Sequence, residues 1–184
     1  IIIDNFNAVS DAVDYLYQLG HKRIGFITGL EDSDVGKNRH AGYTNGLTKH
    51  GLKPDDKLVF KGTFTFESGL EGADYFLSLK NPPTAILCAN DSMAIAVVGK
   101  LIQEGLNVPD DISIVGFDDI PFASHIHPPL TTIAAPIQKI ADLAVNMLVT
   151  QIQNKEIDNK HVALPAKLVK RSTCSELKKA TAAA

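Results

Sequence analysis

Two adjacent acids, Asp118 and Asp119, follow the apolar run ISIVGF at residues 112–117 and come just before Pro121. Paired carboxylates can serve as the acid and base of an enzyme, but both must then face one substrate bond. Neighbouring residues of an extended segment point in opposite directions, so this pair cannot do so. We therefore expect Asp118 to face the hydroxyl groups of a ligand and Asp119 to belong to the turn that leads toward Pro121.

Other polar or aromatic residues follow the remaining strand-like runs. The loop 29–38, which contains Ser33, follows RIGFIT and leads to Arg39; Phe64 follows KLVFKG; Asn90 follows AILCA. In a parallel α/β sheet, ligands bind outside the carboxyl ends of the strands. A guanidinium fork, a carboxylate, an amide and an aromatic face suit a polyhydroxylated ligand.

Several of the residues at the strand ends could instead have a purely structural role. Asp91 precedes a helical stretch and is favoured as its N-cap, with Asn90 as the other candidate, because only one of the two can cap. Arg39 could be a solvated surface cation. Phe64 could be a core residue.

Patterns typical of enzymes and metal sites are weak in this sequence. GLEDSDVGKN at residues 29–38 has the wrong spacing for a phosphate loop, ends in Asn38 instead of a hydroxyl residue, and carries acids that repel phosphate. His125 and His127 have no third metal ligand nearby and are interpreted as ordinary loop residues. The sequence contains no G-x-S-x-G motif. We therefore predict no catalytic residue, no metal and no cofactor.

The elements that must position these residues alternate along the chain. Helical periodicity covers residues 7–19, 36–50, 67–79, 91–104 and 137–152, and short β-branched runs lie between most of these stretches. The strand-like runs are residues 23–28, 56–62, 83–89, 112–117, 130–133 and 161–171. This order predicts an α/β fold with a parallel sheet and helices on both faces.

Helix 91–104 differs from the others because residues 93–99, MAIAVVG, carry no polar side chain. A helix that is apolar all round is buried on more than one side. A sheet covers only one side, so we expect a subunit contact or an adjoining domain on the other.

Composition and charge argue against some classes of protein. The chain has 184 residues, 45% of them hydrophobic, and a formal net charge of −3. This charge argues against nucleic-acid binding by these residues alone, and no apolar run is long enough to span a membrane. Cys88 and Cys174 look like isolated thiols, which favours a reducing, cytoplasmic location.

Five segments, in this order and spacing, resemble the effector-binding core of LacI/GalR-type transcriptional repressors. They are GHKRIGFITG, KNRHAGY, AILCANDSMAIAVVGKLIQEGLNVPDDISIVGFDD, PPLTTIAAPIQKIADLAVNML and LVKRSTC. The resemblance implies a core like that of periplasmic sugar-binding proteins, with two subdomains and an effector in the cleft between them. It also implies that this chain is a fragment without the DNA-binding head and most of the N-terminal subdomain.

The resemblance divides the chain into four parts. Residues 1–131 would form the C-terminal effector-binding subdomain, residues 132–160 a crossover strand and helix of the N-terminal subdomain, 161–175 a returning strand and 176–184 a tail. The apolar face of helix 137–152 would then lack its native partner within this chain. The implied function is sensing of a small sugar or related metabolite by a homodimeric repressor that binds operator DNA through its head. The alternative is a periplasmic sugar-binding protein of a transport system.

Residue by residue, the resemblance places Arg39, Asn90 and Asp118 against the effector and Phe64 as a stacking aromatic. Ser33 and Val35 fall in a loop that varies with effector type. Ala135 stands where some members have a polar contact and offers only a methyl group. The implied dimer contact uses helix 91–104 and the loop 121–129, which carries the two histidines.

Overall fold

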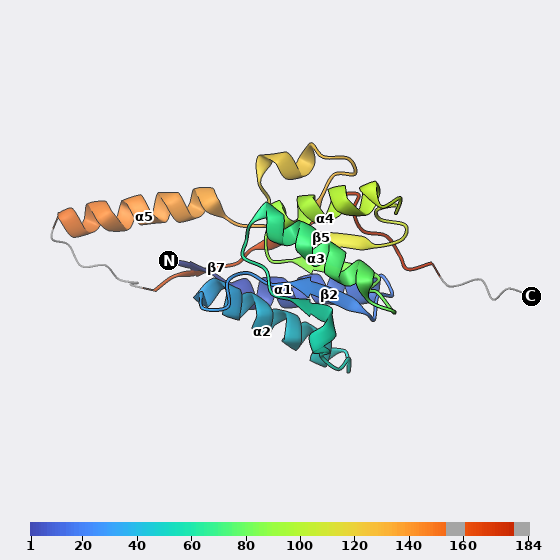
Figure 1. Cartoon of the computed structure of the whole chain (residues 1–184). Coiled ribbons are helices and arrows are strands. Elements are labelled where there is room, and N and C mark those ends of the chain that lie inside the picture. The colour runs from blue at the N-terminus through green and yellow to red at the C-terminus, as the bar shows by residue number, and fades with distance from the viewer. Residues whose placement is uncertain (154–160, 179–184) are drawn as a thin grey trace, which may run out of the picture.

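A computed structural model describes residues 1–153 and 161–178 of the chain. Its centre is a six-stranded sheet with the order β3-β2-β4-β5-β6-β8, in which all neighbouring pairs are parallel except β6 and β8 (Figure 1). The strands are β2 Ile24–Ile27, β3 Val59–Phe60, β4 Ala85–Cys88, β5 Ser113–Asp118, β6 Thr131–Ala134 and β8 Lys167–Val169. A separate parallel pair joins β1 Ile2–Ile3 to β7 Ala163–Leu164.

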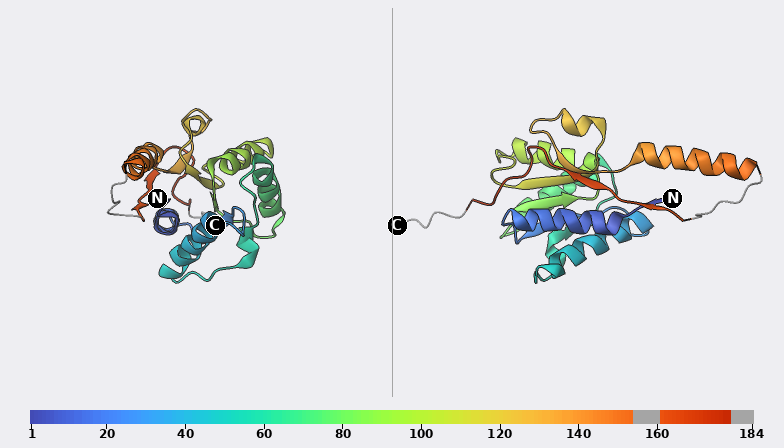
Figure 2. Two further views of the ribbon diagram at one scale, coloured as in Figure 1. Left: turned by 90° about the vertical axis from the view of Figure 1, so that its left-hand side faces the viewer. Right: turned by 180° about the vertical axis from the view of Figure 1, so that it is seen from behind.

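Four helices cover the two faces of this sheet, as predicted. The helices α1 and α2 pack together on one face, and α3 and α4 pack together on the other (Figure 2). Their bounds are α1 Asn5–Gln18, α2 Asp34–Lys49, α3 Phe66–Ser78 and α4 Asp91–Gln103. Two short 3-10 turns cover Asp56–Leu58 and Pro121–Ser124. The α/β fold class with a mostly parallel sheet is therefore confirmed.

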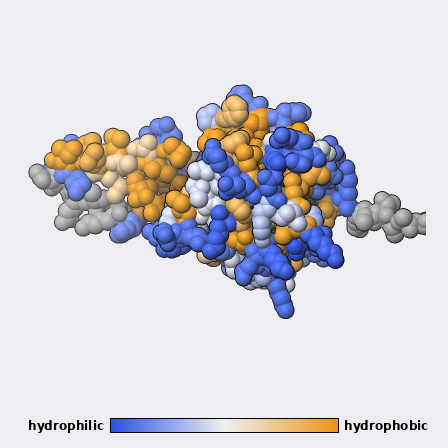
Figure 3. Space-filling view, in the orientation of Figure 1, coloured by the Kyte–Doolittle hydropathy of each residue, from blue (hydrophilic) through white to orange (hydrophobic). Residues whose placement is uncertain are grey.

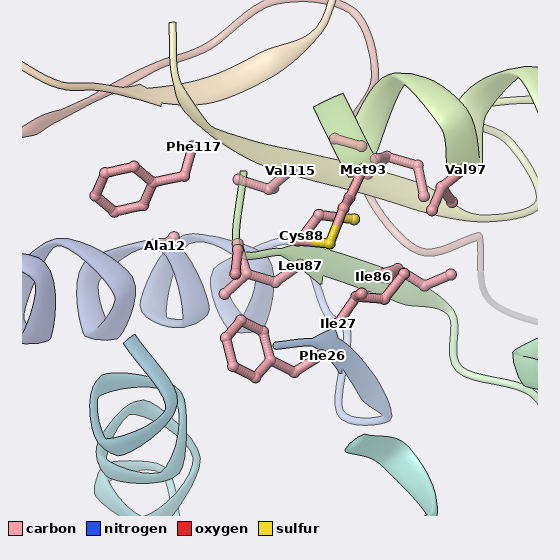
Figure 4. Packing of buried hydrophobic residues seen from close by; sticks show 14 of the residues in the cluster. Ala12, Phe26, Ile27, Ile86, Leu87, Cys88, Met93, Val97, Val115 and Phe117 are labelled. Atoms are coloured by element: carbon pink, nitrogen blue, oxygen red, sulfur yellow. The ribbon is translucent and has the colours of Figure 1, made fainter. Parts of the chain in front are cut away.

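The core lies between the sheet and these helices. Strands β2 and β4 are buried along their whole length, as expected for central strands with helices on both sides. The largest buried side chains include Phe26 of β2, Phe117 of β5 and Met93 of α4 (Figure 4). Cys88 and Cys174 are both free thiols, and Cys88 is buried in this core.

The helix α4 is buried on two sides, but α3 accounts for much of the second side. The two helices approach so closely that a Cβ on Gly69 of α3 would lie 2.5 Å from the backbone oxygen of Met93. The apolar residues all round α4 are therefore explained largely by the sheet and α3. They do not by themselves require a subunit contact. The part of the α4 surface that stays exposed to solvent is small, and it includes Ile102, which is 48% exposed.

The helix α5, Ile137–Ile152, extends away from the sheet and has no buried residue (Figure 1). Its bounds agree with the predicted 137–152. Apolar side chains lie exposed along it (Figure 3), and Val145, Leu148 and Ile152 are between 57% and 71% exposed. An amphipathic helix normally buries its apolar stripe, so α5 has no partner for that stripe among the described residues.

Two predicted strands are shorter than expected. Of residues 56–62, only Val59–Phe60 form a strand, because the 3-10 turn Asp56–Leu58 precedes it. The run 161–171 is divided into β7 and β8, with Pro165 between them, where a proline cannot donate to a strand ladder. Residues 154–160 and 179–184 lie outside the described residues, and so do those parts of the predicted crossover segment and tail.

Among the described residues, no helix has the length and apolarity that a membrane crossing requires.

Candidate functional site

The carboxyl ends of the parallel strands carry the candidate site. Strand β5 ends at Asp118, β4 leads through Ala89 to Asn90, and the chain after β3 reaches Phe64. Arg39 lies on α2, the helix that follows β2. The fold therefore brings these side chains to one edge of the sheet, as the general rule for α/β proteins predicts.

Arg39 is the centre of this group and is buried, with 5% of its surface exposed. Its Nε donates to Oδ1 of Asn5 at 2.8 Å, one terminal nitrogen donates to the backbone oxygen of Ala89, and the other lies 3.5 Å from Oδ1 of Asp118. The guanidinium carbon lies 3.4 Å from the centre of the Phe117 ring. The interpretation of Arg39 as a solvated surface cation is therefore wrong.

Burial changes the pKa of both charged partners. Desolvation lowers the pKa of Arg39 to about 10, and the nearby Asp118 opposes that change. Desolvation likewise raises the pKa of Asp118, against the opposing charge of Arg39. Arg39 remains a cation at neutral pH. Because 37% of the Asp118 side chain is exposed, its carboxylate can still accept hydrogen bonds from a ligand.

Phe64 lies against the same group in an unusual backbone conformation, with a φ of 65°. Its ring packs over Gly29, where a Cβ would lie 1.8 Å from Cζ of the ring. The ring centre is 6.0 Å from the guanidinium carbon of Arg39. Phe64 is partly buried and packs against the core, as the core interpretation has it, and its contact with a ligand stays a prediction.

Asn90, and not the favoured Asp91, is the N-cap of α4. Its Oδ1 accepts from the backbone N–H of Met93 at 2.9 Å, while its Nδ2 donates to the backbone oxygen of Phe64 at 2.8 Å. Asn90 therefore holds the Phe64 loop against α4. The preference for Asp91 fails because Asp91 is fully buried and hydrogen-bonds to the segments after β5 and in β6 instead.

Ser33 is not joined to the other predicted residues. It caps α2, accepting from the backbone N–H of Gly36 at 3.0 Å and donating to the backbone oxygen of Leu30 at 2.8 Å. Val35 lines a cavity of about 500 Å³ that also borders Arg39, Asn5 and Ile140 of α5. Asp118, Asn90 and Phe64 do not line this cavity, so Arg39 is the residue that the cavity and the strand-end group share.

Three residues of this region were not predicted from the sequence. Asn5 orients Arg39, Phe117 lies under its guanidinium, and Arg171 pairs with Asp119 at 2.7 Å. Arg171 stands in the terminal motif LVKRSTC, so its place in a recognised segment was the available signal. Phe117 stands in the recognised segment that ends in ISIVGFDD and had the same signal, whereas Asn5 had none, because its role depends on a contact between distant segments.

The structure adds no metal site. Among residues 1–153 and 161–178, no three His, Cys, Asp or Glu side chains are grouped as metal ligands. His125 bonds within its own loop, with Nδ1 lying 2.8 Å from the backbone oxygen of Pro121.

These features define a class of protein: an α/β binding core with a buried arginine, a carboxylate and an aromatic ring at the strand ends. The chain belongs to the periplasmic binding protein-like domain family, whose pattern it matches over residues 13–174. Its relatives and structural neighbours are repressors of the LacI family. The resemblance seen in the sequence is thereby confirmed.

Three comparisons illustrate this membership. The chain is 39% identical over 175 residues to the HTH-type transcriptional repressor CytR of Escherichia coli strain K12, covering 95% of this chain and 51% of that protein. It superimposes on the complex of the transcriptional regulator CelR with cellobiose with a TM-score of 0.88 and 31% identity, covering 93% and 52% of the two chains. The Lac repressor dimer bound to operator and the anti-inducer ONPF gives a TM-score of 0.86 and 32% identity, covering 95% and 60%.

The chain thus spans about half the length of the curated relatives that it matches.

Proposed function

We propose that this chain is the effector-sensing part of a DNA-binding transcriptional repressor and that it binds a small sugar or related metabolite without chemistry. The relatives named above are transcription regulators, which favours this function over sugar transport. The complex of a structural neighbour with cellobiose supports a carbohydrate-like ligand.

The observation that carries the proposal is the buried Arg39 beside the half-exposed Asp118 at the strand ends. Two of the guanidinium nitrogens have close partners, whereas the contact with Asp118 is long, at 3.5 Å. A ligand hydroxyl placed between these two groups would donate to the carboxylate and accept from the guanidinium. The ring of Phe64 would then lie beside the ligand.

Effector binding would act through the two segments that lead to and from α5. In this proposal residues 1–131 form one subdomain, 132–160 cross into a second, and 161–175 return. The exposed apolar face of α5 supports the assignment, because the second subdomain would cover it. A ligand held between the subdomains would favour one relative orientation of the two, and that orientation would alter operator binding.

The proposed partners are a second copy of the protein and operator DNA. The dimer would form through α4 and the loop 121–129, where Ile102 and Phe122 are 48% and 62% exposed. A hollow of about 360 Å³ between these two segments is lined by Ile102, Val108 and His127, among others. DNA would be bound by a head domain outside this chain, in the cytoplasm.

Calorimetry of the intact protein tests the ligand site. The panel contains D-ribose, D-glucose, cellobiose, the ribonucleosides, and glucuronate as an anionic sugar. At least one neutral compound is expected to bind, and Arg39→Ala is expected to weaken it by about 100-fold, since a charge-assisted hydrogen bond to a buried group is lost. Arg23→Ala, at the opposite end of the sheet, is the matched control. Equal affinity of wild type and Arg39→Ala would exclude the assignment.

A second measurement tests the regulatory part. Fluorescence anisotropy of operator DNA with the intact protein is expected to change when the bound panel compound is added, because the effector and the DNA share one conformational equilibrium. Unchanged DNA affinity at a saturating ligand concentration would contradict a sensing role.

A further inference from the structure

The turn after β5 has a backbone conformation that its own residues do not favour. Asp118 and Asp119 are consecutive residues with φ values of 115° and 57°. Residues other than glycine rarely adopt a positive φ, and they keep it only where the surrounding structure holds them. The carboxylate of Asp118 is aimed by this turn, so whatever holds the turn also sets the position of the proposed effector contact.

One anchor of the turn is Arg171, which follows β8. Its Nη2 donates to Oδ1 of Asp119 at 2.7 Å and its Nη1 donates to the backbone oxygen of Leu130 at 2.9 Å. Its backbone N–H donates to the hydroxyl of Thr131 at 2.9 Å. The side chains of Arg171 and Asp119 are only 20% and 26% exposed, so solvent screens this pair less than a surface pair. Arg171 thus connects the turn to Leu130, just before β6, and to Thr131, the first residue of β6.

The other anchor is Asp91, which is fully buried at the start of α4. Its Oδ2 accepts from the backbone N–H of Ile120 at 2.9 Å, and its Oδ1 accepts from the hydroxyl of Thr132 on β6. A Cβ on Gly116 would lie 2.2 Å from Oδ1, so a glycine is needed beside this carboxylate. Asp91 therefore holds the turn through the backbone N–H of Ile120, while Arg171 holds it through the side chain of Asp119.

We propose that Arg171 is a positioning residue for the effector site: through Asp119 it holds the turn in the conformation that presents Asp118 beside Arg39. The same guanidinium is bonded to the end of the segment that leads into β6, and Arg171 itself follows β8. Any shift of β6 and β8 relative to each other is therefore transmitted to the effector contact. The role of Asp118 as that contact rests on the proposed function, whereas the clamp between Arg171 and the turn does not.

Amide hydrogen exchange of the intact protein, measured by NMR without any ligand, tests the clamp. In Arg171→Met the amide of Ile120 is expected to exchange about 10-fold faster or more, because a charge-assisted hydrogen bond that holds the turn is lost. Arg23→Met is the matched control, since Arg23 also pairs with an acid, Asp55 at 3.5 Å, and also bonds a backbone oxygen. The control is expected to leave the Ile120 amide unchanged.

A double-mutant cycle separates positioning from general loss of stability. Asp119→Asn is expected to accelerate the same exchange, and adding Arg171→Met to it is expected to change the rate by less than about 3-fold, because the pair is already broken. Arg171→Lys, which keeps the charge, is expected to restore part of the protection. Additive effects, or equal acceleration of amides throughout the sheet, would overturn the proposal. Because the readout needs no ligand, it remains decisive even if every panel compound fails to bind.

Discussion

At the scale of single residues, the buried Arg39 dominates the candidate site because its neighbours come from three different segments. Asn5 is the first residue of α1, Ala89 follows β4, Phe117 lies in β5 and Asp118 ends that strand. Lysine cannot reproduce this planar fork, which donates in several fixed directions at once.

This geometry gives a prediction for Arg39→Lys. The variant keeps the charge but loses the simultaneous bonds to Asn5 and Ala89, so binding of the tightest panel compound is expected to weaken about 10-fold or more. Calorimetry on the intact protein measures this change. A lysine variant that binds as tightly as wild type would show that the charge alone matters and that the fork does not.

Asp91 gives a pH-dependent prediction. Burial raises its pKa to about 6, against the hydrogen bonds from Thr132 and Ile120, from an ordinary value of 3.8. Because the folded-state pKa is the higher one, the stabilising contribution of the protonated group is complete below about pH 3.8. It is lost as the pH rises through about 6.

The variant Asp91→Asn isolates this effect. Its amide can still accept from the Ile120 N–H and can donate to Thr132. We therefore expect its free energy of unfolding, relative to wild type, to rise by on the order of 3 kcal/mol between pH 4 and pH 7. Urea unfolding at several pH values measures the difference, with the exposed Asp32→Asn as control. A difference that stays constant, or falls with pH, would refute this account of Asp91.

Gly29 and Phe64 form a third testable pair. A methyl group at residue 29 would overlap the Phe64 ring, so Gly29→Ala is expected to lower the free energy of unfolding by about 1 to 3 kcal/mol through overpacking. In a Phe64→Ala background the same change is expected to cost little, because the ring is gone. Thermal unfolding of the four proteins checks this, and equal costs in both backgrounds would place the clash elsewhere.

At the scale of elements, α5 is the helix whose surroundings are incomplete among the described residues. Val145 is 59% exposed although it lies on an amphipathic helix. If the second subdomain covers this face in the intact protein, Val145→Asp is expected to destabilise that protein by about 2 kcal/mol or more, since a charge would be buried without a partner.

In the isolated 184-residue chain the same variant is expected to have almost no effect on unfolding, because the side chain is already in water. Asn146→Asp, on the polar face, is the control and is expected to be neutral in both. Urea denaturation of the two lengths of protein measures the contrast. An equal cost of Val145→Asp in both would contradict the domain assignment.

Elements were predicted well where periodicity was long and less well where strands were short. Helices 137–152 and 91–104 agree with the structure to within a residue, because their apolar pattern extends over several turns. The choice of cap at α4 failed because Asn90 and Asp91 are equally good caps in isolation. Only the distant partners Thr132 and Ile120 decide that Asp91 is used elsewhere, and no local pattern contains them.

At the scale of the whole molecule, the mostly parallel sheet with helices on both faces followed from the sequence, whereas the order of its strands was not predicted. The alternation of elements predicts a parallel sheet, and the rule for its carboxyl ends brings Arg39, Asn90, Phe64 and Asp118 to one edge. The network that holds them could not be predicted, because its hydrogen bonds join residues that are far apart in the sequence. The separation is 34 positions between Asn5 and Arg39, 29 between Asp91 and Ile120, and 52 between Arg171 and Asp119.

The proposed dimer is also a property of the whole molecule. The double variant Ile102→Glu and Phe122→Glu places charges on the remaining exposed surface of α4 and on the loop 121–129, and we expect it to convert the intact protein from dimer to monomer. Sedimentation velocity measures this, with Ala41→Glu on α2 as control. A double variant that stays dimeric at the same concentration would place the subunit contact on another surface.

The central claim is that a small effector binds at the carboxyl ends of the strands, between Arg39 and Asp118. A crystal structure of the intact protein with the tightest compound of the panel tests it most directly. We expect ligand hydroxyl oxygens within hydrogen-bond distance of the Asp118 carboxylate and the Arg39 guanidinium, with the Phe64 ring beside the ligand. A ligand found instead in the hollow between α4 and the loop 121–129, with no contact to Asp118 or Arg39, would contradict the account.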